Sequence, residues 1–344
     1  MDAVLHIPKH KLLSLLEHAS GSWQVFCPSR QGPTVNFGWF EGMVDPDLIP
    51  VNSCKGAFLP QTEELFTYRG TPETGLSLAA GVDEQKPVLV FFARPCDARA
   101  FTLLDRVFLE GEYADDRYKN RRARSVVVTV GCKSPLDTCF CTAFGIGPDS
   151  KAGSDVFVYD DGTSLYFEPL TEEGAGFVSS HSAYLTEGGT PVSVMEELRR
   201  AELPLAGRIS VEGMAEALDS MFDDPVWEKM SARCRGCGAC TYLCPTCHCF
   251  SVFDAPRGVR GKRYRSWDSC QFSDFMLMAG GHNPRPTRKE RVRQRFMHKF
   301  NYSVKRQGDY LCVGCGRCIR ACSVGLHAAS ALFDLKEAGR CKGC

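Results

Sequence analysis

The sequence has no apolar run that approaches the length of a transmembrane span. Its first twenty residues follow an amphipathic helical pattern but lack the long apolar core of a signal peptide. Lysine and arginine together number 41, as do aspartate and glutamate, so the formal net charge is zero. This balance gives no global signal for a nucleic acid or a membrane surface. We therefore expect a cytoplasmic protein that neither inserts into a membrane nor binds nucleic acid.

Nucleotide-binding and hydrolase motifs are missing as well. No GxGxxG follows a predicted strand, no Walker A loop is present, and Gly145-Ile146-Gly147 is too short a fragment to count. The eight histidines are scattered, and no Ser/His/Asp arrangement stands out. We expect that the chain itself binds neither flavin nor NAD.

Cysteine, in contrast, is abundant, with nineteen among 344 residues. In a cytosolic chain, cysteines at ligand spacing indicate metal sites, because disulfides are rare in that compartment. The length predicts two or three domains, and the apolar fraction of 44% suffices for a true core.

Two cysteine runs share the spacing C-x2-C-x2-C-x3-C, which is typical of two-cluster ferredoxins, where the fourth cysteine of each run ligates the other cluster. The spacing predicts one [4Fe-4S] cluster on Cys234, Cys237, Cys240 and Cys322, and a second on Cys312, Cys315, Cys318 and Cys244. Zinc also accepts CxxC pairs, but two runs at identical spacing favour iron–sulfur clusters. Glycines at 236, 238, 314 and 316 are expected to adopt positive φ and turn amides toward sulfur.

The chain divides into four predicted regions. Residues 1–150 alternate helix and strand patterns, with a helix over 10–19, a buried strand over 87–92, a helix over 98–109 and a buried strand over 125–130. This order predicts an α/β domain with a parallel sheet. Residues 151–230 form a connector, with a hairpin over 155–170 that turns at Asp161-Gly162 and a helical stretch in which Asp224 caps a helix started by Pro225. Residues 231–330 are an α+β ferredoxin-like domain interrupted by an insertion at 245–311, and 331–344 are a tail.

A third cysteine set lies in the α/β domain. Cys96 follows one predicted strand, and Cys132, Cys139 and Cys141 follow the next. Because ligands gather at the carboxyl ends of parallel strands, these four thiols could hold a third [4Fe-4S] cluster. The alternative is that they are small buried hydrophobic residues. Cys54 is a spare candidate for this edge, and Cys27 is interpreted as structural.

The insertion and the tail carry further cysteines. Cys247, Cys249 and Cys270, with His248, could hold a fourth cluster or a zinc ion, or could simply pack. Cys341 and Cys344 form a CxxC pair at the extreme end, where mobility is usual.

A basic stretch closes the insertion. Residues 285–306 hold nine lysines and arginines against one acid, Glu290. This stretch is interpreted either as a solvated helix face, or as a set of cations that stabilise a reduced cluster or dock an acidic partner.

Several motifs together resemble a known family. They are Arg94-Pro95-Cys96-Asp97-Ala98-Arg99, Gly131-Cys132 with Cys139-Phe140-Cys141, the segment Cys244–Phe250, Trp267-Asp268-Ser269-Cys270, and the segment Gly281–Pro286. Over about residues 85–330 the chain is similar to a family of iron–sulfur subunits that includes those of anaerobic sulfite reductase and the sulfhydrogenase beta subunit. It also resembles iron–sulfur subunits of flavin oxidoreductases that serve heterodisulfide reductases.

The resemblance implies an electron-transfer subunit between a flavin/NAD(P)H-binding partner subunit and a terminal redox subunit of reductase or hydrogenase type. Two other classes remain open. One is a catalytic reductase that uses an incompletely ligated cluster in the insertion. The other is a structural zinc protein with an interaction role.

Overall fold

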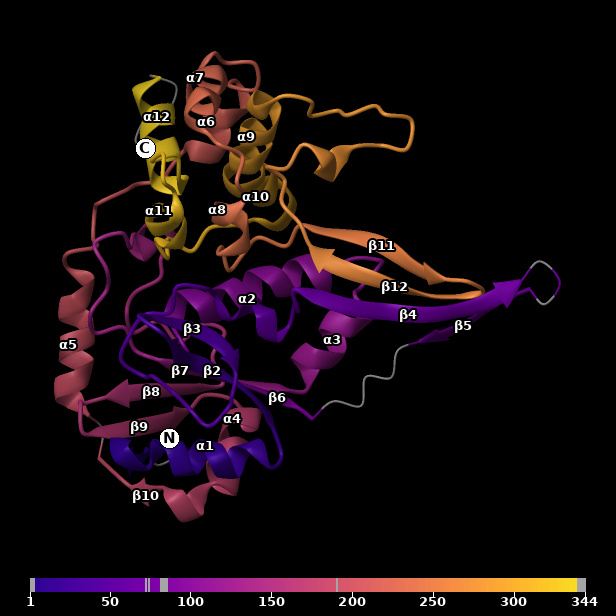
Figure 1. The fold of residues 1–344 in the computed structure, drawn as a ribbon. Coiled ribbons are helices and arrows are strands. Elements are labelled where there is room, and N and C mark those ends of the chain that lie inside the picture. The colour runs from indigo at the N-terminus through magenta and orange to yellow at the C-terminus, as the bar shows by residue number, and fades with distance from the viewer. Residues whose placement is uncertain (1–3, 72, 74, 81–85, 190, 339–344) are drawn as a thin grey trace.

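The computed structural model describes residues 4–71, 73, 75–80, 86–189 and 191–338. Its lower body in Figure 1 is an eight-stranded mixed sheet with the order β10-β1-β9-β8-β7-β6-β2-β3. The strands of this sheet are β1 (Leu5–Pro8), β2 (Gln24–Gln31), β3 (Thr34–Trp39), β6 (Val88–Ala93), β7 (Ser125–Val130), β8 (Val156–Asp160), β9 (Ser164–Pro169) and β10 (Thr186–Glu187). The pairings β2–β6, β6–β7 and β7–β8 are parallel, which confirms the predicted parallel α/β sheet.

Helices cover both faces of this sheet and build the upper body. They are α1 (Leu12–Ser20), α2 (Pro95–Phe108), α3 (Asp116–Ala123), α4 (Glu172–Ser180), α5 (Val192–Glu202), α6 (Met214–Asp219), α7 (Val226–Arg233), α8 (Ala239–Tyr242), α9 (Arg288–Met297), α10 (Ser303–Gln307), α11 (Arg317–Ala321) and α12 (Ala328–Glu337). A π-helical segment, His298–Tyr302, joins α9 to α10. None of the helices in the described ranges is both long and apolar enough to span a membrane.

Strand β6 shows why the sheet is covered on both sides. All six of its residues are buried, and successive side chains of a strand point to opposite faces. Val88 and Val90 join the core under α2, whereas Leu89 and Phe91 join the core under α1 and α4. A continuous apolar run is the pattern of a strand buried on both faces.

Two local predictions need correction. The first twenty residues are not one helix, because Leu5–Pro8 forms β1 between β9 and β10, and the helix begins only at Leu12. Ile7 is fully buried in the sheet core, while its neighbours are half-buried, which is a strand-like alternation. Pro225 lies at the N-cap of α7 instead of its first turn, and the Asp224 carboxylate accepts from the Val226 amide at 2.9 Å.

The predicted hairpin at 155–170 is confirmed as β8 and β9, with the positive-φ Gly162 in its turn. Both strands belong to the large sheet. The predicted division at residue 150 therefore falls between strands of one sheet.

The upper body is helical around the two cysteine runs. Helices α6, α7, α9 and α12 share one hydrophobic core around the fully buried Trp227. Within the described part of residues 231–330, the strands are β11 (Phe250–Arg257) and β12 (Arg260–Trp267), and both leave this body.

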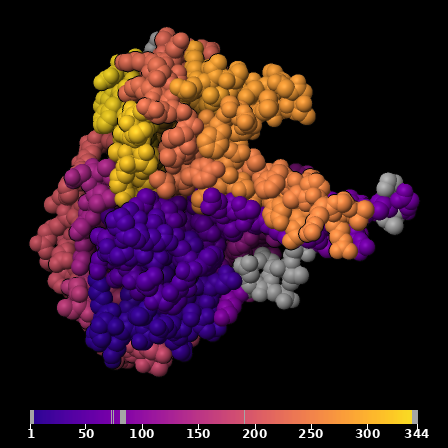
Figure 2. Space-filling view, in the orientation of Figure 1, coloured from indigo at the N-terminus to yellow at the C-terminus, as the bar shows by residue number. Residues whose placement is uncertain are grey.

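An arm projects from the junction of the two bodies (Figures 1 and 2). Its four antiparallel strands have the order β11-β12-β4-β5, with β4 (Thr62–Thr71) and β5 (Gly75–Ala80) contributed by the first half of the chain. At its base, the buried Arg265 donates to the Glu63 carboxylate from Nε at 2.7 Å. The insertion is thus fixed to the α/β domain by strand pairing and a buried ion pair.

Candidate metal-cluster centres

The first cysteine run forms a loop that ends in α8. Gly236 and Gly238 have φ of 70° and 75°. The Gly236 amide donates to Cys234 Sγ at 3.3 Å, so this amide turns toward sulfur as the glycine pattern predicted. Cys237 is the exposed thiol of this run. The loop therefore presents one edge of the candidate cluster to the surface.

The second run lies directly against the loop that carries Cys139 and Cys141. Gly314 and Gly316 also have positive φ, at 59° and 70°. A Cβ at Gly314 would lie 2.3 Å from the Phe140 carbonyl oxygen, and the Phe140 amide donates to the Gly314 oxygen at 2.8 Å. Glycine is needed here both for its backbone conformation and for the close approach of two loops.

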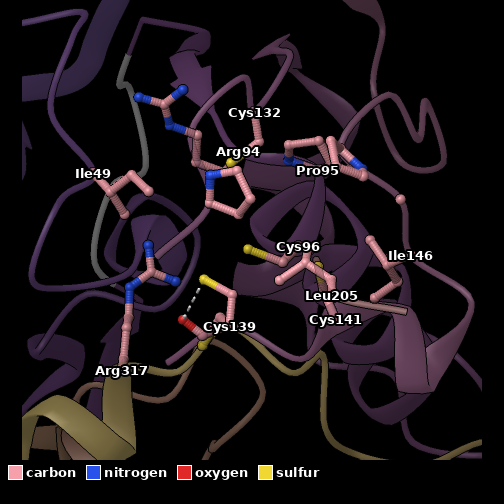
Figure 3. A pocket seen from close by; sticks show the side chains of 14 residues that line it. Ile49, Arg94, Pro95, Cys96, Cys132, Cys139, Cys141, Ile146, Leu205 and Arg317 are labelled. Atoms are coloured by element: carbon pink, nitrogen blue, oxygen red, sulfur yellow. Dashed lines mark hydrogen bonds between the residues drawn. The ribbon is translucent and has the colours of Figure 1, made fainter. Parts of the chain in front are cut away.

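The four N-terminal cysteines line one cavity, as the strand order predicted (Figure 3). Cys96 lies in the first turn of α2, just after β6, and Cys132 follows the adjacent parallel strand β7. Cys315 of the second run lines the same cavity, and Cys139 Sγ lies 4.0 Å from its carbonyl oxygen. No local pattern marked this fifth thiol as a member of the set.

Two other cysteines of the α/β domain lie outside this cavity lining. Cys54 is buried in a short turn. Cys27 packs into the sheet core, where burial raises its pKa to about 12.

Buried polar groups around the N-terminal cavity suit an anionic occupant. Arg94 and Arg317 both line it, and the Nε of each is buried without a hydrogen-bond partner in the described structure. Arg317 also makes a bidentate pair with Asp97 at 2.8 and 2.7 Å, with both side chains almost fully buried. A cluster with four thiolates is an anion that could accept from the free Nε donors. The donor set and the cavity therefore fit a [4Fe-4S] cluster.

Burial also sets the protonation of these thiols. It raises the pKa of Cys139 to about 11 and of Cys141 to about 12, and it raises the pKa of Cys96 and Cys132 as well. Buried thiols of this kind ionise at neutral pH only when a metal takes the place of the proton.

Cys244, the last cysteine of the first run, is electrostatically coupled to the second run. The negative charge of its thiolate raises the pKa values of Cys312, Cys315 and Cys318, which burial raises as well. Cys322, the last cysteine of the second run, packs against the same hydrophobic core as Cys234. The same core also holds Cys312 and Cys318, so the fourth cysteines lie among thiols of both runs.

The insertion cysteines line a separate cavity together with His248, His298, Arg295 and Lys299. A hydrogen bond from Cys247 lowers the pKa of the Cys244 thiol, and one from Cys249 lowers that of Cys270 to about 6. Burial lowers the pKa of His248 to about 4 and of His298 to about 3, so both imidazoles are neutral at pH 7.

The basic stretch divides between the interior and the surface. Arg295 and Lys299 are each only 4% exposed. Lys299 Nζ lies 3.2 Å from Cys244 Sγ, and Arg295 donates to Cys247 Sγ at 3.7 Å. Arg288, in contrast, lies on the surface. The sequence pattern alone did not separate the inward-facing cations from the solvated ones.

Lys55 is a further buried basic residue that sequence reasoning missed, and burial lowers its pKa. It is 3% exposed, donates to the Cys247 carbonyl oxygen at 3.0 Å and lies 4.2 Å from the Trp267 ring centroid. No motif marks it, because its partners are 186 or more residues away in the sequence.

Among the residues that the structure describes, no three His, Cys, Asp or Glu side chains converge as one metal ion would require. Cys341 and Cys344 lie outside the described residues.

Comparison with known proteins first identifies the class of protein to which the chain is similar. Residues 233–326 match the 4Fe-4S dicluster domain, which covers both cysteine runs. The chain is also 33% identical over 260 residues to sulfhydrogenase 2 subunit beta of Pyrococcus furiosus, an alignment that covers 74% of this chain and 76% of that protein. The chain belongs to this family of iron–sulfur electron-transfer subunits. No solved structure matches it.

Proposed function

We propose that this chain relays electrons between a flavin/NAD(P)H-binding partner subunit and a terminal redox subunit in the cytoplasm. The observation that carries the proposal is the contact between cysteine sets. Cys315 of the second run lines the cavity of the N-terminal set, and Cys244 of the first run is coupled to the second run. Carriers that lie next to one another suit the passage of electrons from one to the next, a role in which no substrate has to reach them.

The ferredoxin pair takes the crossed ligands that its spacing predicts. One cluster uses Cys234, Cys237, Cys240 and Cys322, and the other uses Cys312, Cys315, Cys318 and Cys244. The coupling of Cys244 to three thiols of the second run supports this crossing. When bound, these clusters supply one-electron redox chemistry. The chain positions the thiols, with Cys244 and Cys312 buried and Cys237 exposed.

A third cluster occupies the N-terminal cavity on Cys96, Cys132, Cys139 and Cys141. The unpartnered Nε groups of Arg94 and Arg317 support it, because two buried guanidinium donors favour an anion at that place. Cys315 would then ligate the second-run cluster while its carbonyl oxygen faces the Cys139 loop.

We infer an order of stations from the arrangement of the cysteine sets. The N-terminal cluster adjoins the second-run cluster, which adjoins the first-run cluster, and the last of these reaches the surface at Cys237. An open polar groove lined by Arg235, Asp274 and Arg288 lies beside that exposed edge. We place the contact with one partner subunit there. The similarity to a sulfhydrogenase beta subunit supports a partner of hydrogenase or reductase type.

The test uses the whole chain purified without oxygen. It should carry about twelve irons or more, at four per cubane, and it should not oxidise NADH or NADPH alone. Cys96→Ser with Cys139→Ser should remove about four irons and slow electron passage between the two partner subunits. Stoichiometric flavin on the isolated chain, together with NAD(P)H oxidation, would contradict the proposal. One zinc and no iron would favour the structural zinc protein.

A further inference from the structure

The insertion cavity is built by the register of the arm. Phe250 of β11 pairs with Trp267 of β12, and the Asp268 amide donates to the Cys249 carbonyl oxygen at 2.9 Å. The hairpin therefore brings Cys270 back beside Cys249, although about twenty residues separate them in the chain. Cys247 lines the same cavity from the segment that enters the hairpin. Three thiols thus line one cavity at the base of the arm.

Two buried cations line this cavity without a carboxylate partner. Arg295 and Lys299 are each 4% exposed, and neither takes part in an ion pair with Asp or Glu in the described ranges. A buried cation without a counter-charge is costly. The Cys244 thiolate accounts for one negative charge beside Lys299. Arg295 donates to Cys247 Sγ at 3.7 Å, so an anionic group bound at Cys247 would give this cation a counter-charge within the cavity.

His248 has the hydrogen bonding of a metal ligand. Its Nδ1 lies 3.0 Å from the Thr246 carbonyl oxygen, which fixes the proton on Nδ1 and leaves the Nε2 lone pair free. The same ring lines the cavity with the three thiols. Three thiolates and one neutral imidazole form a complete ligand set for an iron–sulfur cluster, as histidine can replace cysteine on such clusters.

We propose that Cys247, Cys249, Cys270 and His248 hold a fourth iron–sulfur cluster, whose negative charge is balanced by Arg295 and Lys299. A single zinc ion fits less well, because the thiols line a cavity and, in the described part of the chain, no three ligand side chains converge on one point. The proposal rests on the proposed relay only for its electron supply.

The redox step of this centre is a one-electron exchange. Two ligands of the ferredoxin pair are its neighbours. Cys244, assigned to the second-run cluster, is hydrogen-bonded to Cys247, and Cys240, assigned to the first-run cluster, interacts electrostatically with Cys270. When bound, the insertion cluster would take up one electron as a cluster of the ferredoxin pair gives one up. The ligating thiolates would stay ionised, so no proton would move. The surrounding cations stabilise the extra negative charge.

The experiment compares metal content between matched full-length variants purified without oxygen. The test variant is Cys249→Ser with Cys270→Ser, and the control is Cys27→Ser, a buried cysteine outside all four thiol sets. Iron, sulfide and zinc are assayed together with Mössbauer spectra, and circular dichroism verifies the fold. We expect the test variant to lose about four irons and four sulfides relative to the control. If it fails to fold, Cys247→Ser alone should give the same loss.

Two outcomes would overturn the fourth cluster. In one, the folded variants keep all the iron of the control. In the other, they lose about one zinc and no iron. The criterion is a difference between variants, so it does not depend on the total. A missing N-terminal cluster would instead appear as an unchanged iron content in Cys96→Ser with Cys139→Ser, which separates failure of the relay from failure of this proposal.

Discussion

Replacing Lys299 by methionine should lower the potential of the second-run cluster. The substitution keeps most of the side-chain volume and removes one buried positive charge. Burial opposes that charge, but the thiolates of Cys244 and Cys247 raise the pKa of Lys299, so it is protonated at pH 7. Its Nζ lies 3.2 Å from Cys244 Sγ. Removing it takes away an interaction that favours the reduced, more negative cluster.

The size of the effect follows from Coulomb's law. An electron added to the irons beyond the sulfur lies roughly 6 Å from Nζ, and at an effective dielectric constant of about 20 the interaction is about 3 kcal/mol. For one electron, about 1.4 kcal/mol corresponds to about 59 mV. The potential should therefore fall by about 120 mV.

The assay is an anaerobic redox titration followed by electron paramagnetic resonance, with iron content as a check on loading. Lys305→Met is the matched control, because Lys305 lies in the same helical stretch but is exposed and pairs with Asp219 at the surface. Solvent screening should keep its effect within about 20 mV. A fully loaded Lys299→Met protein whose potential stays within about 30 mV of the wild type would refute the reasoning, given the buried geometry.

Other contacts in the structure can be tested by single substitutions. Cys244→Ala should damage the cluster of the second run, and spectroscopic damage confined to the first-run cluster would exclude the crossing. Gly314→Ala should lower the free energy of unfolding by about 3 kcal/mol or more. Gly258 also has a positive φ, but a Cβ added there would have no atom within 4 Å, so Gly258→Ala should lower that free energy by about 1 kcal/mol. Arg317→Met leaves a buried carboxylate unpaired and should cost about 3–5 kcal/mol in denaturant unfolding; a loss below about 1 kcal/mol would show that the pair is dispensable. Arg288→Glu should slow reduction by the partner at low salt more than at high salt, and a salt-independent rate would remove this surface from the docking site.

Local sequence patterns predicted the elements whose partners are close in the chain. The all-apolar segment 125–130 forms β7, the hairpin turns at Gly162, and the glycines between ligands have positive φ. Cys96 and Cys132 could be placed at one cavity because parallel strands bring their carboxyl ends to one edge. These features follow from local turn and strand patterns and from the rule that neighbouring strands of a βαβ unit are parallel.

Contacts between distant segments were beyond such rules. Strand β12 is rich in arginine and lysine and has the composition of solvated chain, yet it pairs with β4, so that Lys262 lies opposite Thr67. Arg295 and Lys299 have the same charge pattern as their exposed neighbours, and only packing separates them. Lys55 carries no motif at all. Burial of a cation depends on which thiols the fold brings near it, and no local pattern indicates that.

The arm has a consequence for how the chain can be made and divided. Strand β4 emerges early in synthesis, but its partner β12 is complete only at Trp267. Until then, one edge of β4 lacks its strand partner, and bare edges of this kind attract other chains. In a fragment that ends before the insertion, this edge of β4 would stay permanently unpaired. We expect such fragments to aggregate and the arm to be slow to assemble, because its strand pairing closes a loop of nearly two hundred residues.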